Sequence, residues 1–231
     1  NLQCFLAGKN LGYAKGNNLG LSKVKSKYAL ILNPDATLNN DTLEEFLNSA
    51  ENFSDFAIIG PARQDEYKNF DNKENLEQVF QVNSLKGFAM FLNLEEFQEV
   101  GFFDDNFFIY LEEIDLCKRL KKKGKKIYLD RKIIVHHIGG SSHNKKIDFE
   151  MELSRNWHWM WSTFYFNKKH FGYPYAIISV GKKFFSSLIK IIFYSLTFNR
   201  HKKKIYLHRF LGLFNSIIGN KSWYRPKINN N

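Results

Sequence analysis

Three carboxylates within four positions, Glu112, Glu113 and Asp115, are the side chains in this sequence best placed to act on a proton. Carboxylates this close repel one another, which raises their pKa values. A carboxyl group tuned in this way can act as a general base towards a hydroxyl. The alternative is structural, because a helix dipole favours acids at the helix start. The aromatic run Phe107–Tyr110 before them predicts a buried neighbourhood and weakens that alternative.

A second constellation, Asn33-Pro34-Asp35, follows the apolar run Tyr28–Leu32, which is typical of a buried strand ending at a turn. Ligands of open α/β sheets bind at the carboxyl ends of strands. A carboxylate there can hold Mg²⁺ or Mn²⁺ against a diphosphate, since both cations prefer oxygen ligands. The same residues also form a common turn, and that interpretation stays open.

Two further segments could bind ligands. His136 and His137 follow a β-rich run and precede Gly139-Gly140-Ser141. A neutral imidazole can be a metal ligand, and a surface pair in a glycine-rich loop is the alternative. The segment Asn10–Asn18 contains glycines that permit close backbone approach, with Asn and Lys as donors. It lacks the spacing of a P-loop or a dinucleotide fingerprint, so a loop leading into a helix is the alternative.

The elements that position these residues follow from short apolar runs. Strands are predicted at residues 28–32, 56–59, 87–92, 126–129 and 133–135, and helices after Asn39-Asn40-Asp41, over 95–100 and over 114–123. Strands alternating with helices predict an α/β sheet that is mostly parallel and flanked by helices. Residues 62–80 are polar and mixed, and we interpret them as a loop or a variable insertion.

Charge divides the 231-residue chain in two. Its net charge is +11, but residues 1–150 hold 20 basic and 22 acidic residues, whereas residues 151–231 hold 14 basic residues and one acid, Glu152. Hydrophobic content of 44% and aromatic content of 16% exclude a disordered chain. Two cysteines, Cys4 and Cys117, exclude a disulfide framework or a four-cysteine zinc site.

The basic part contains an amphipathic pattern over residues 176–198. A polar stripe recurs at helical spacing, and apolar residues lie off it. The stripe consists of Ser179, Lys183, Ser186, Lys190 and Thr197, and the apolar residues are Ile178, Phe185, Leu188, Ile189 and Ile192. This pattern favours a helix lying in a membrane interface over one that spans it. An ordinary helix packed on the rest of the protein is the alternative.

In this order, the motifs resemble glycosyltransferase family 2, in its rhamnosyltransferase-like branch. The resemblance covers about residues 8–145. The matching residues are Asn10–Ala14 with Gly16 and Asn18, Leu32–Ala36, Gly87–Met90, Val100–Asp105, Phe107–Tyr110, Glu112–Leu120, Gly124 and Val135–His137 through Gly139–Ser141.

The resemblance implies a GT-A fold and inverting transfer of a sugar, nominally rhamnose, from a nucleotide-sugar donor to a hydroxyl. It implies that Asp35 binds a divalent cation, Mg²⁺ or Mn²⁺, with support from His136. It places Glu113 where the family most often has an aspartate as base, which leaves Glu112 and Asp115 as alternatives, and it turns Asp104 towards the acceptor. The residues that it assigns to the donor pocket are Asn10, Gly12, Lys15, Asn18, Asn33, Asp35 and Gly87.

The chain begins at Asn1 and in mid-pattern, so we expect the nucleotide-binding start of the family to be missing and the isolated chain to be weakly active at most. Residues 1–148 are expected to form the transferase domain, and residues 149–231 a basic, membrane-associating helical extension. The expected acceptor is a glycan or lipid-linked glycan in cell-surface polysaccharide synthesis. The expected location is cytoplasmic, peripheral to the inner face of the cell membrane, with anionic lipids as partners. Two other functions stay open: a non-catalytic membrane-surface scaffold, and a basic nucleic-acid-binding protein, although the positive charge avoids the motif-bearing part.

Overall fold

The computed structural model describes residues 3–62, 78–137 and 147–226 and divides the chain into two compact units. The first unit comprises Asn1–Gly8, Lys15–Asp104 and Glu113–Ser142. The second comprises Lys9–Ala14, Asp105–Glu112 and His143–Asn231. The division therefore falls within two motif-bearing segments and assigns Asn10 and Glu112 to the same unit as the C-terminal helices.

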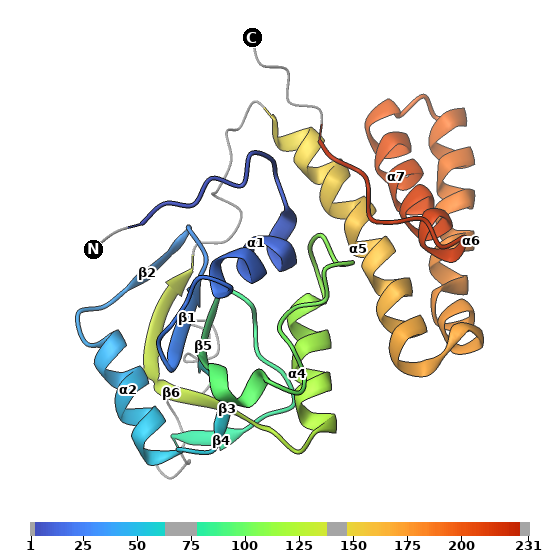
Figure 1. The fold of residues 1–231 in the computed structure, drawn as a ribbon. Coiled ribbons are helices and arrows are strands. Elements are labelled where there is room, and N and C mark those ends of the chain that lie inside the picture. Colours follow the sequence, from blue (N-terminus) through green and yellow to red (C-terminus); the bar gives the residue numbers. More distant parts are fainter. Residues whose placement is uncertain (1–2, 63–77, 138–146, 227–231) are drawn as a thin grey trace. The chain divides into compact units, whose positions relative to one another are not determined.

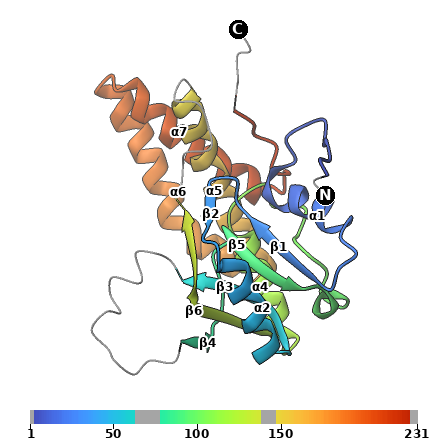
Figure 2. The ribbon, with the colours of Figure 1, turned by 90° about the vertical axis from the view of Figure 1, so that its left-hand side faces the viewer.

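The first unit is a mixed sheet with helices, which confirms the predicted α/β class. Its strands are β1 (Tyr28–Leu32), β2 (Ala36–Leu38), β3 (Phe56–Ala62), β4 (Val79–Gln81), β5 (Ala89–Asn93) and β6 (Lys126–His137). They follow the order β1-β5-β3-β6-β2, and β4 also pairs with β6 (Figures 1 and 2). Its helices are α2 (Thr42–Asn52), the short 3₁₀ helix η1 (Leu94–Phe97) and most of α1 (Gly12–Leu21) and α4 (Glu112–Lys122).

The prediction that the sheet is mostly parallel is wrong for the described strands. β3 and β6 pair in parallel, whereas β5 pairs antiparallel with both β1 and β3, and β2 and β4 pair antiparallel with β6. β1, β3 and β6 do run in the same direction, as strands linked through helices should. The difference is β5, which enters between β1 and β3 with the opposite direction, and sequence patterns do not encode strand order.

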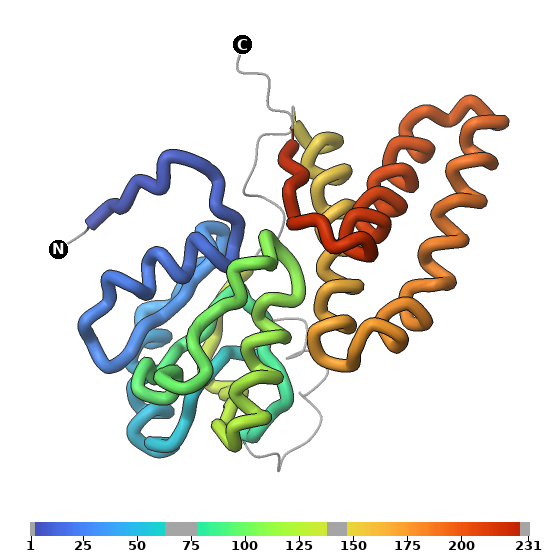
Figure 3. Tube along the Cα trace, turned by 45° about the vertical axis from the view of Figure 1, so that its right-hand side comes forward, coloured from blue at the N-terminus to red at the C-terminus, as the bar shows by residue number. Residues whose placement is uncertain are grey.

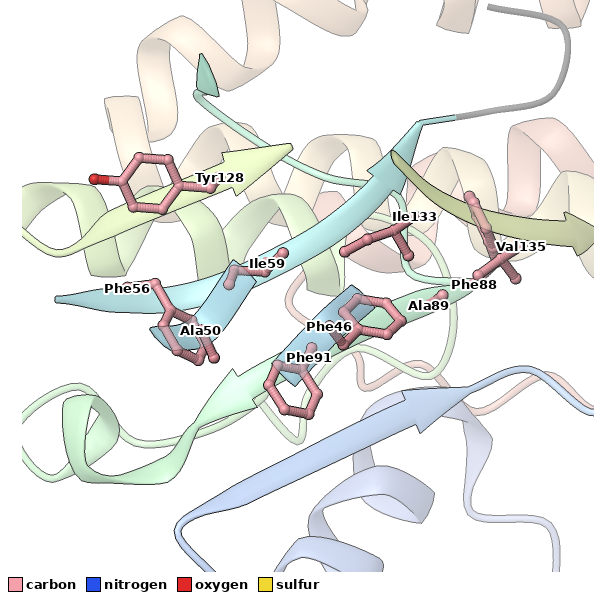
Figure 4. Packing of buried hydrophobic residues seen from close by; sticks show 10 residues of the cluster. All are labelled: Phe46, Ala50, Phe56, Ile59, Phe88, Ala89, Phe91, Tyr128, Ile133 and Val135. Carbon is pink, nitrogen blue, oxygen red and sulfur yellow. The ribbon is translucent and has the colours of Figure 1, made fainter. Parts of the chain in front are cut away.

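The core of the first unit lies between α2 and the sheet. Every residue of β3 and β5 is buried. Phe46 and Ala50 of α2 pack against Phe56 and Ile59 of β3 and Phe91 of β5, as Figure 4 shows from close by. The spacing of Phe46 and Ala50 is one helical turn, which explains why this face of α2 is the buried one.

Two predicted boundaries differ from the structure. The strand predicted at 56–59 is longer in the structure, where β3 continues through Gly60 and Pro61 to Ala62. Gly60 is packed closely, since a Cβ there would lie 2.9 Å from the side chain of Leu85. The two strands predicted at 126–129 and 133–135 form one strand, β6, with an irregularity after Asp130. The buried Asp130 carboxylate holds that irregularity by accepting hydrogen bonds from Ser49 Oγ and Lys132 N, both at 2.8 Å.

The second unit is built on three long helices, α5 (Asp148–Phe171), α6 (Tyr173–Leu196) and α7 (Arg200–Ile217), which pack on one another (Figure 3). Met160, Phe164, Val180 and Leu213 form its buried core. A Cβ on Gly212 would lie 2.2 Å from the carbonyl oxygen of Trp157, so glycine is needed where α7 meets α5. Among the described residues, the structure contains no helix long and apolar enough to cross a membrane.

Candidate active site

Asp35 lies in the turn between β1 and β2, and its carboxylate faces a histidine of β6. Asp35 Oδ1 and His137 Nε2 are 3.1 Å apart, and their side chains are 9% and 28% exposed. Backbone hydrogen bonds fix the turn: Asn33 N donates to Phe88 O at 2.9 Å, and Ala36 N donates to Asn33 O at 3.0 Å. The His137 ring stacks on Phe88, with centroids 5.0 Å apart. The ends of β1 and β6 and the start of β5 therefore hold this pair together.

His137, and not the expected His136, lies against Asp35. Successive side chains of a strand point to opposite faces of the sheet. Ile133 and Val135 of β6 belong to the buried core with Phe88, and His137, two residues further along, shares their face. His136 lies opposite Thr37 in the β2–β6 register, so its side chain is directed to the other face. Gly139–Ser141, which the sequence joined to this motif, lie outside the described residues.

The Asp35–His137 pair offers two ligand atoms of the kinds that Mn²⁺ and Mg²⁺ accept. Neighbouring ligands of an octahedral ion with bonds of about 2.1 Å lie about 3.0 Å apart, close to the separation of Asp35 Oδ1 and His137 Nε2. In the described part of the chain, no group of three or more His, Cys, Asp or Glu residues could hold a metal. A cation held by this pair would need its other ligands from outside these two side chains, such as a diphosphate and water.

Glu113 lies in the first turn of α4 and is half-buried. Burial raises the pKa of Glu113, and hydrogen bonds from backbone N–H groups and the positive charge of Lys86 oppose that increase. One turn further along, Cys117 is fully buried, and burial raises its pKa to about 12. A carboxyl group with a raised pKa, beside a cation and partly open to solvent, is a candidate general base.

The segment Lys86–Phe88, which leads into β5, contributes a residue to the surroundings of each group. Lys86 acts electrostatically on Glu113. Two residues later, Phe88 supports the His137 ring. Gly87, expected in the donor pocket, lies between them in the chain. The two residues of this segment therefore act on different groups: the charge of Lys86 acts on Glu113, and the ring of Phe88 contacts His137.

Asp115, one of the alternative bases, has a structural environment. Its side chain is fully buried, and its carboxylate accepts a hydrogen bond from Arg119 Nε at 2.8 Å. The same guanidinium donates to the carbonyl oxygens of Val100 and Phe102. Asp115 thereby orients an arginine that fixes the turn before Asp104, and these contacts favour Glu113 over Asp115 as the base.

Glu112 and Asp104 occupy different surroundings from Glu113. Glu112 is 4% exposed and belongs to the second unit. There, burial raises the pKa of Tyr110, the charge of Arg155 opposes that increase, and the charge of Glu112 adds to it. Asp104 is half-buried at the end of its turn in the first unit.

The residues expected to line the donor pocket near the start of the chain mostly contact the protein itself. The Asn18 amide donates to Phe103 O at 2.8 Å and accepts from Phe103 N at 3.0 Å. Asn10 Oδ1 accepts from Gly12 N at 2.9 Å. A Cβ on Gly12 would lie 2.3 Å from the carbonyl oxygen of Phe108, so the close approach that glycine permits is to the chain's own loop. Lys15 is exposed on α1.

Sequence reasoning missed the backbone conformation before α4. Tyr110 and Leu111 both have positive φ, 75° and 68°, a region that side chains other than glycine seldom adopt. No composition signal marks this pair, because neither residue is typical of such a conformation. The choice between the two histidines, in contrast, could have been made from the alternation of Ile133 and Val135.

The family model and the related sequences that match this chain are all glycosyltransferases. The family model described as glycosyl transferase family 2 matches residues 1–117. The low-salt glycan biosynthesis hexosyltransferase Agl10 of Haloferax volcanii is 24% identical over 147 residues, which cover 51% of this chain and 45% of that protein. The rhamnosyltransferase WbbL of Escherichia coli is 25% identical over 197 residues, covering 69% of this chain and 71% of that protein.

Among solved structures, the mannosyltransferase PcManGT from Pyrobaculum calidifontis, in complex with GDP-Man and Mn²⁺, is similar with a TM-score of 0.49 and 10% identity. The similarity covers 89% of this chain and 66% of that one. The chain therefore spans less than half of the length of the hexosyltransferase and about two thirds of the length of the other two proteins.

Proposed function

The chain belongs to glycosyl transferase family 2, and we propose that its protein transfers a sugar from a nucleotide-sugar donor to a hydroxyl, with inversion at the anomeric carbon. Two observations support the proposal: burial raises the pKa of the half-buried Glu113, and Asp35 and His137 lie together at the ends of β1 and β6. Glu113 could accept a proton, and the Asp35–His137 pair could hold a cation that binds a diphosphate.

The mechanism follows from these two groups. Glu113 takes the proton of the acceptor hydroxyl, and the hydroxyl oxygen attacks the anomeric carbon from the face opposite the diphosphate. The new carbon–oxygen bond forms as the bond to the diphosphate breaks, and the nucleoside diphosphate departs with the electron pair. A divalent cation held by Asp35 and His137 would neutralise charge on that diphosphate. The chain's own part is to orient the acceptor against the donor, which lowers the entropic cost of the reaction.

Rhamnose, or another hexose, is the sugar that we propose, and a glycan or lipid-linked glycan of the cell surface is the proposed acceptor. Support comes from the related rhamnosyltransferase and from the glycan-biosynthesis hexosyltransferase. A donor screen by mass spectrometry on the complete protein, with several dTDP-, UDP- and GDP-sugars, identifies the donor.

The decisive test compares Glu113→Gln and Asp35→Ala with a matched exposed carboxylate, Glu95→Gln, in the complete protein. We expect the first two variants to lose at least about a hundredfold in kcat, in line with loss of a general base or a charge stabiliser. Glu95→Gln should keep the rate of the wild type. Full rates in Glu113→Gln would exclude Glu113 as the base, and polysaccharide production unchanged by Asp35→Ala would favour the non-catalytic scaffold.

We further propose that the protein works at the inner face of the cell membrane, with helix α6 against anionic lipid. On α6, five apolar side chains on one helical stripe are between 61% and 79% exposed: Ile178, Phe185, Ile189, Ile192 and Leu196. Two members of the polar stripe of α6 contact the neighbouring helices. Lys190 Nζ donates to Tyr206 OH of α7 at 3.1 Å, and Asn167 of α5 donates to Ser179 Oγ at 2.9 Å.

Charge selects lipid over a second copy of the chain as the occupant of this stripe. Residues 151–231 have 14 basic residues and one acid, so two copies would repel each other. The exposed run Arg200–Lys204 follows α6 directly. Each basic residue near an anionic leaflet contributes about 1 kcal/mol of attraction.

Vesicle sedimentation tests the membrane proposal. The wild type should bind vesicles with 30% anionic lipid and release them as salt rises, because exposed charges are screened. Ile189→Asp with Ile192→Asp should lose most of the binding, whereas Leu47→Asp, a matched exposed position on α2, should not. Equal binding by all variants would refute the assignment of α6. A salt-dependent mobility shift with RNA and no binding to vesicles would favour the nucleic-acid alternative.

A further inference from the structure

Within the second unit, helix α5 contacts the loop that leads into α4 at nearly every residue of the loop. Each residue from Asn106 to Tyr110 contacts one face of α5. The contacts are Asn106 Nδ2 to Tyr165 OH (3.0 Å), the Phe107 ring edge-on to Tyr165 (4.9 Å), the Phe108 ring stacked on His158 (4.6 Å), Ser162 Oγ to Ile109 O (3.0 Å) and the Tyr110 ring edge-on to Trp159 (5.5 Å). Positions 158, 162 and 165 recur at helical spacing, so one side of α5 makes this contact.

The same loop also fixes the segment that contains Gly12. Tyr13 N donates to Phe108 O at 2.7 Å, and Gly12 has no room for a side chain against Phe108. Phe108 is therefore the residue on which α5, the Asn10–Ala14 segment and the approach to α4 converge. A displacement of its ring would be transmitted to Tyr110 and Leu111, whose positive φ persists only while the surroundings hold it.

His158 is itself held by the C-terminal segment. Its Nε2 lies 2.9 Å from Tyr224 O, and its Nδ1 lies 2.9 Å from Ser222 Oγ. A carbonyl oxygen only accepts hydrogen bonds, so Nε2 carries the proton and Nδ1 accepts from the serine hydroxyl. Burial lowers the pKa of His158 to about 3, which keeps the ring neutral. Both nitrogens are therefore used for orientation.

A second contact from the same segment reaches the Phe108 ring directly. The Arg225 guanidinium lies 3.5 Å from the ring centroid of Phe108, a cation–π geometry. The base of the segment is tied to the helices, since Trp161 Nε1 donates to Asn220 O at 2.9 Å. Asn220–Arg225 is termed the C-terminal clasp below.

We infer that His158 and the C-terminal clasp are positioning elements for the candidate base: through Phe108 they set the loop that presents Glu112 and Glu113 at the start of α4. The inference rests on the proposed function in one respect, because the effect on rate requires Glu113 to act in sugar transfer. The effect on the loop itself does not depend on that function.

The primary test replaces His158 in the complete protein by phenylalanine and by glutamine. His158→Phe keeps a ring against Phe108, but it removes the acceptor of the Ser222 hydroxyl and one of the two donors to Tyr224 O, the other being Arg225 Nη1. We expect it to lower kcat about tenfold, equivalent to about 1.4 kcal/mol, with KM for donor and acceptor changed less than about twofold. His158→Gln can donate to Tyr224 O and accept from Ser222, so it should recover most of the rate.

Arg225→Ala provides a second variant that should fold, because Arg225 is exposed. It should lower kcat in the same sense, and Arg225→Lys should restore part of it. His201→Gln, an exposed histidine on α7, is the matched control and should behave as the wild type. The pH profile of kcat should be the same in His158→Gln as in the wild type, since the His158 ring, with its pKa lowered to about 3, stays neutral around neutral pH.

Hydrogen exchange separates the failure of this inference from the failure of the proposed function. The amides of residues 107–111 should exchange faster in His158→Phe and Arg225→Ala, while those of β3 and β5 keep the wild-type rate. Unchanged exchange at 107–111 would overturn the inference even in an inactive protein. Faster exchange with unchanged kcat, a kcat that falls only in proportion to the folded fraction, or a shifted pH profile in His158→Gln would overturn the positioning role. Absence of sugar transfer by the wild type with every donor would refute the proposed function alone.

Discussion

Replacing Asp115 by asparagine should separate structure from chemistry among the three neighbouring acids. The change keeps the size of the side chain but removes the charge that faces Arg119. Removing one partner of a buried ion pair typically costs 3–5 kcal/mol. The Arg119 side chain is 20% exposed and keeps its bonds to Val100 and Phe102, so water and carbonyls compensate in part. We expect a loss of about 2–3 kcal/mol in the free energy of unfolding, which is within the range for hydrogen bonds to charged groups and below that for a fully buried pair.

Urea unfolding measures this loss. The midpoint should fall at an unchanged m value, because the surface exposed on unfolding is the same. A double-mutant cycle with Arg119→Met should give a coupling of at least about 1 kcal/mol, because the two side chains are in contact. The kcat of the folded Asp115→Asn protein should stay within about threefold of the wild type. Wild-type stability together with a hundredfold loss of kcat would refute this reasoning and return Asp115 to the candidates for the base.

Three further predictions concern the site and its loop. Glu113→Gln should abolish transfer yet raise the unfolding midpoint at neutral pH. Burial raises the pKa of Glu113, so the stability that this group contributes is complete below its unfolded pKa and is lost as pH rises through its folded pKa. A midpoint below that of the wild type at pH 7 would contradict this, and kcat/KM of the wild type should rise with pH across the raised pKa. Gly12→Ala should destabilise the protein by more than the roughly 1–2 kcal/mol that a left-handed residue costs, because its Cβ would also strike Phe108, and an unchanged urea midpoint would count against that contact. His137→Ala should weaken Mn²⁺ binding, measured by electron paramagnetic resonance in the presence of a nucleoside diphosphate, more than His136→Ala does; the reverse order would restore the original expectation for His136.

The local elements of the fold were predictable where the chain carries its own signals. The strand at Tyr28–Leu32 has the predicted bounds, and the helix that ends before Gly124 was recognised from the glycine and the basic residues of its last turn. Gly124 has the positive φ (72°) that such a terminator needs. These features depend on a few neighbouring residues, so sequence patterns contain them.

The arrangement of the site depended on contacts that span the chain, and patterns contain much less of it. The sequence predicts that Asp35 and Glu113 take part in chemistry. The partner of Asp35, however, is His137, which lies 102 residues further along the chain and is brought close by strand pairing. The sequence predicts that Gly12 faces a ligand. In the structure a glycine is needed there because a side chain would collide with Phe108, which is distant in sequence. Likewise, the direction of β5 depends on which strands it enters between, which no periodicity reports.

Helix α6 shows the same limit in a form that bears on function. Its periodicity defined two stripes, polar and apolar, but periodicity cannot state which stripe faces the protein. In a soluble hairpin of helices the apolar stripe would be buried. Here Lys190 and Ser179 of the polar stripe bond to α7 and α5, while Ile178 and Ile189 of the apolar stripe are 79% and 66% exposed. A deletion of residues 176–231 would remove α6 and α7 and so uncover Met160 and Phe164 of α5. Substitutions on the apolar stripe leave that core intact and are therefore the cleaner test of membrane binding.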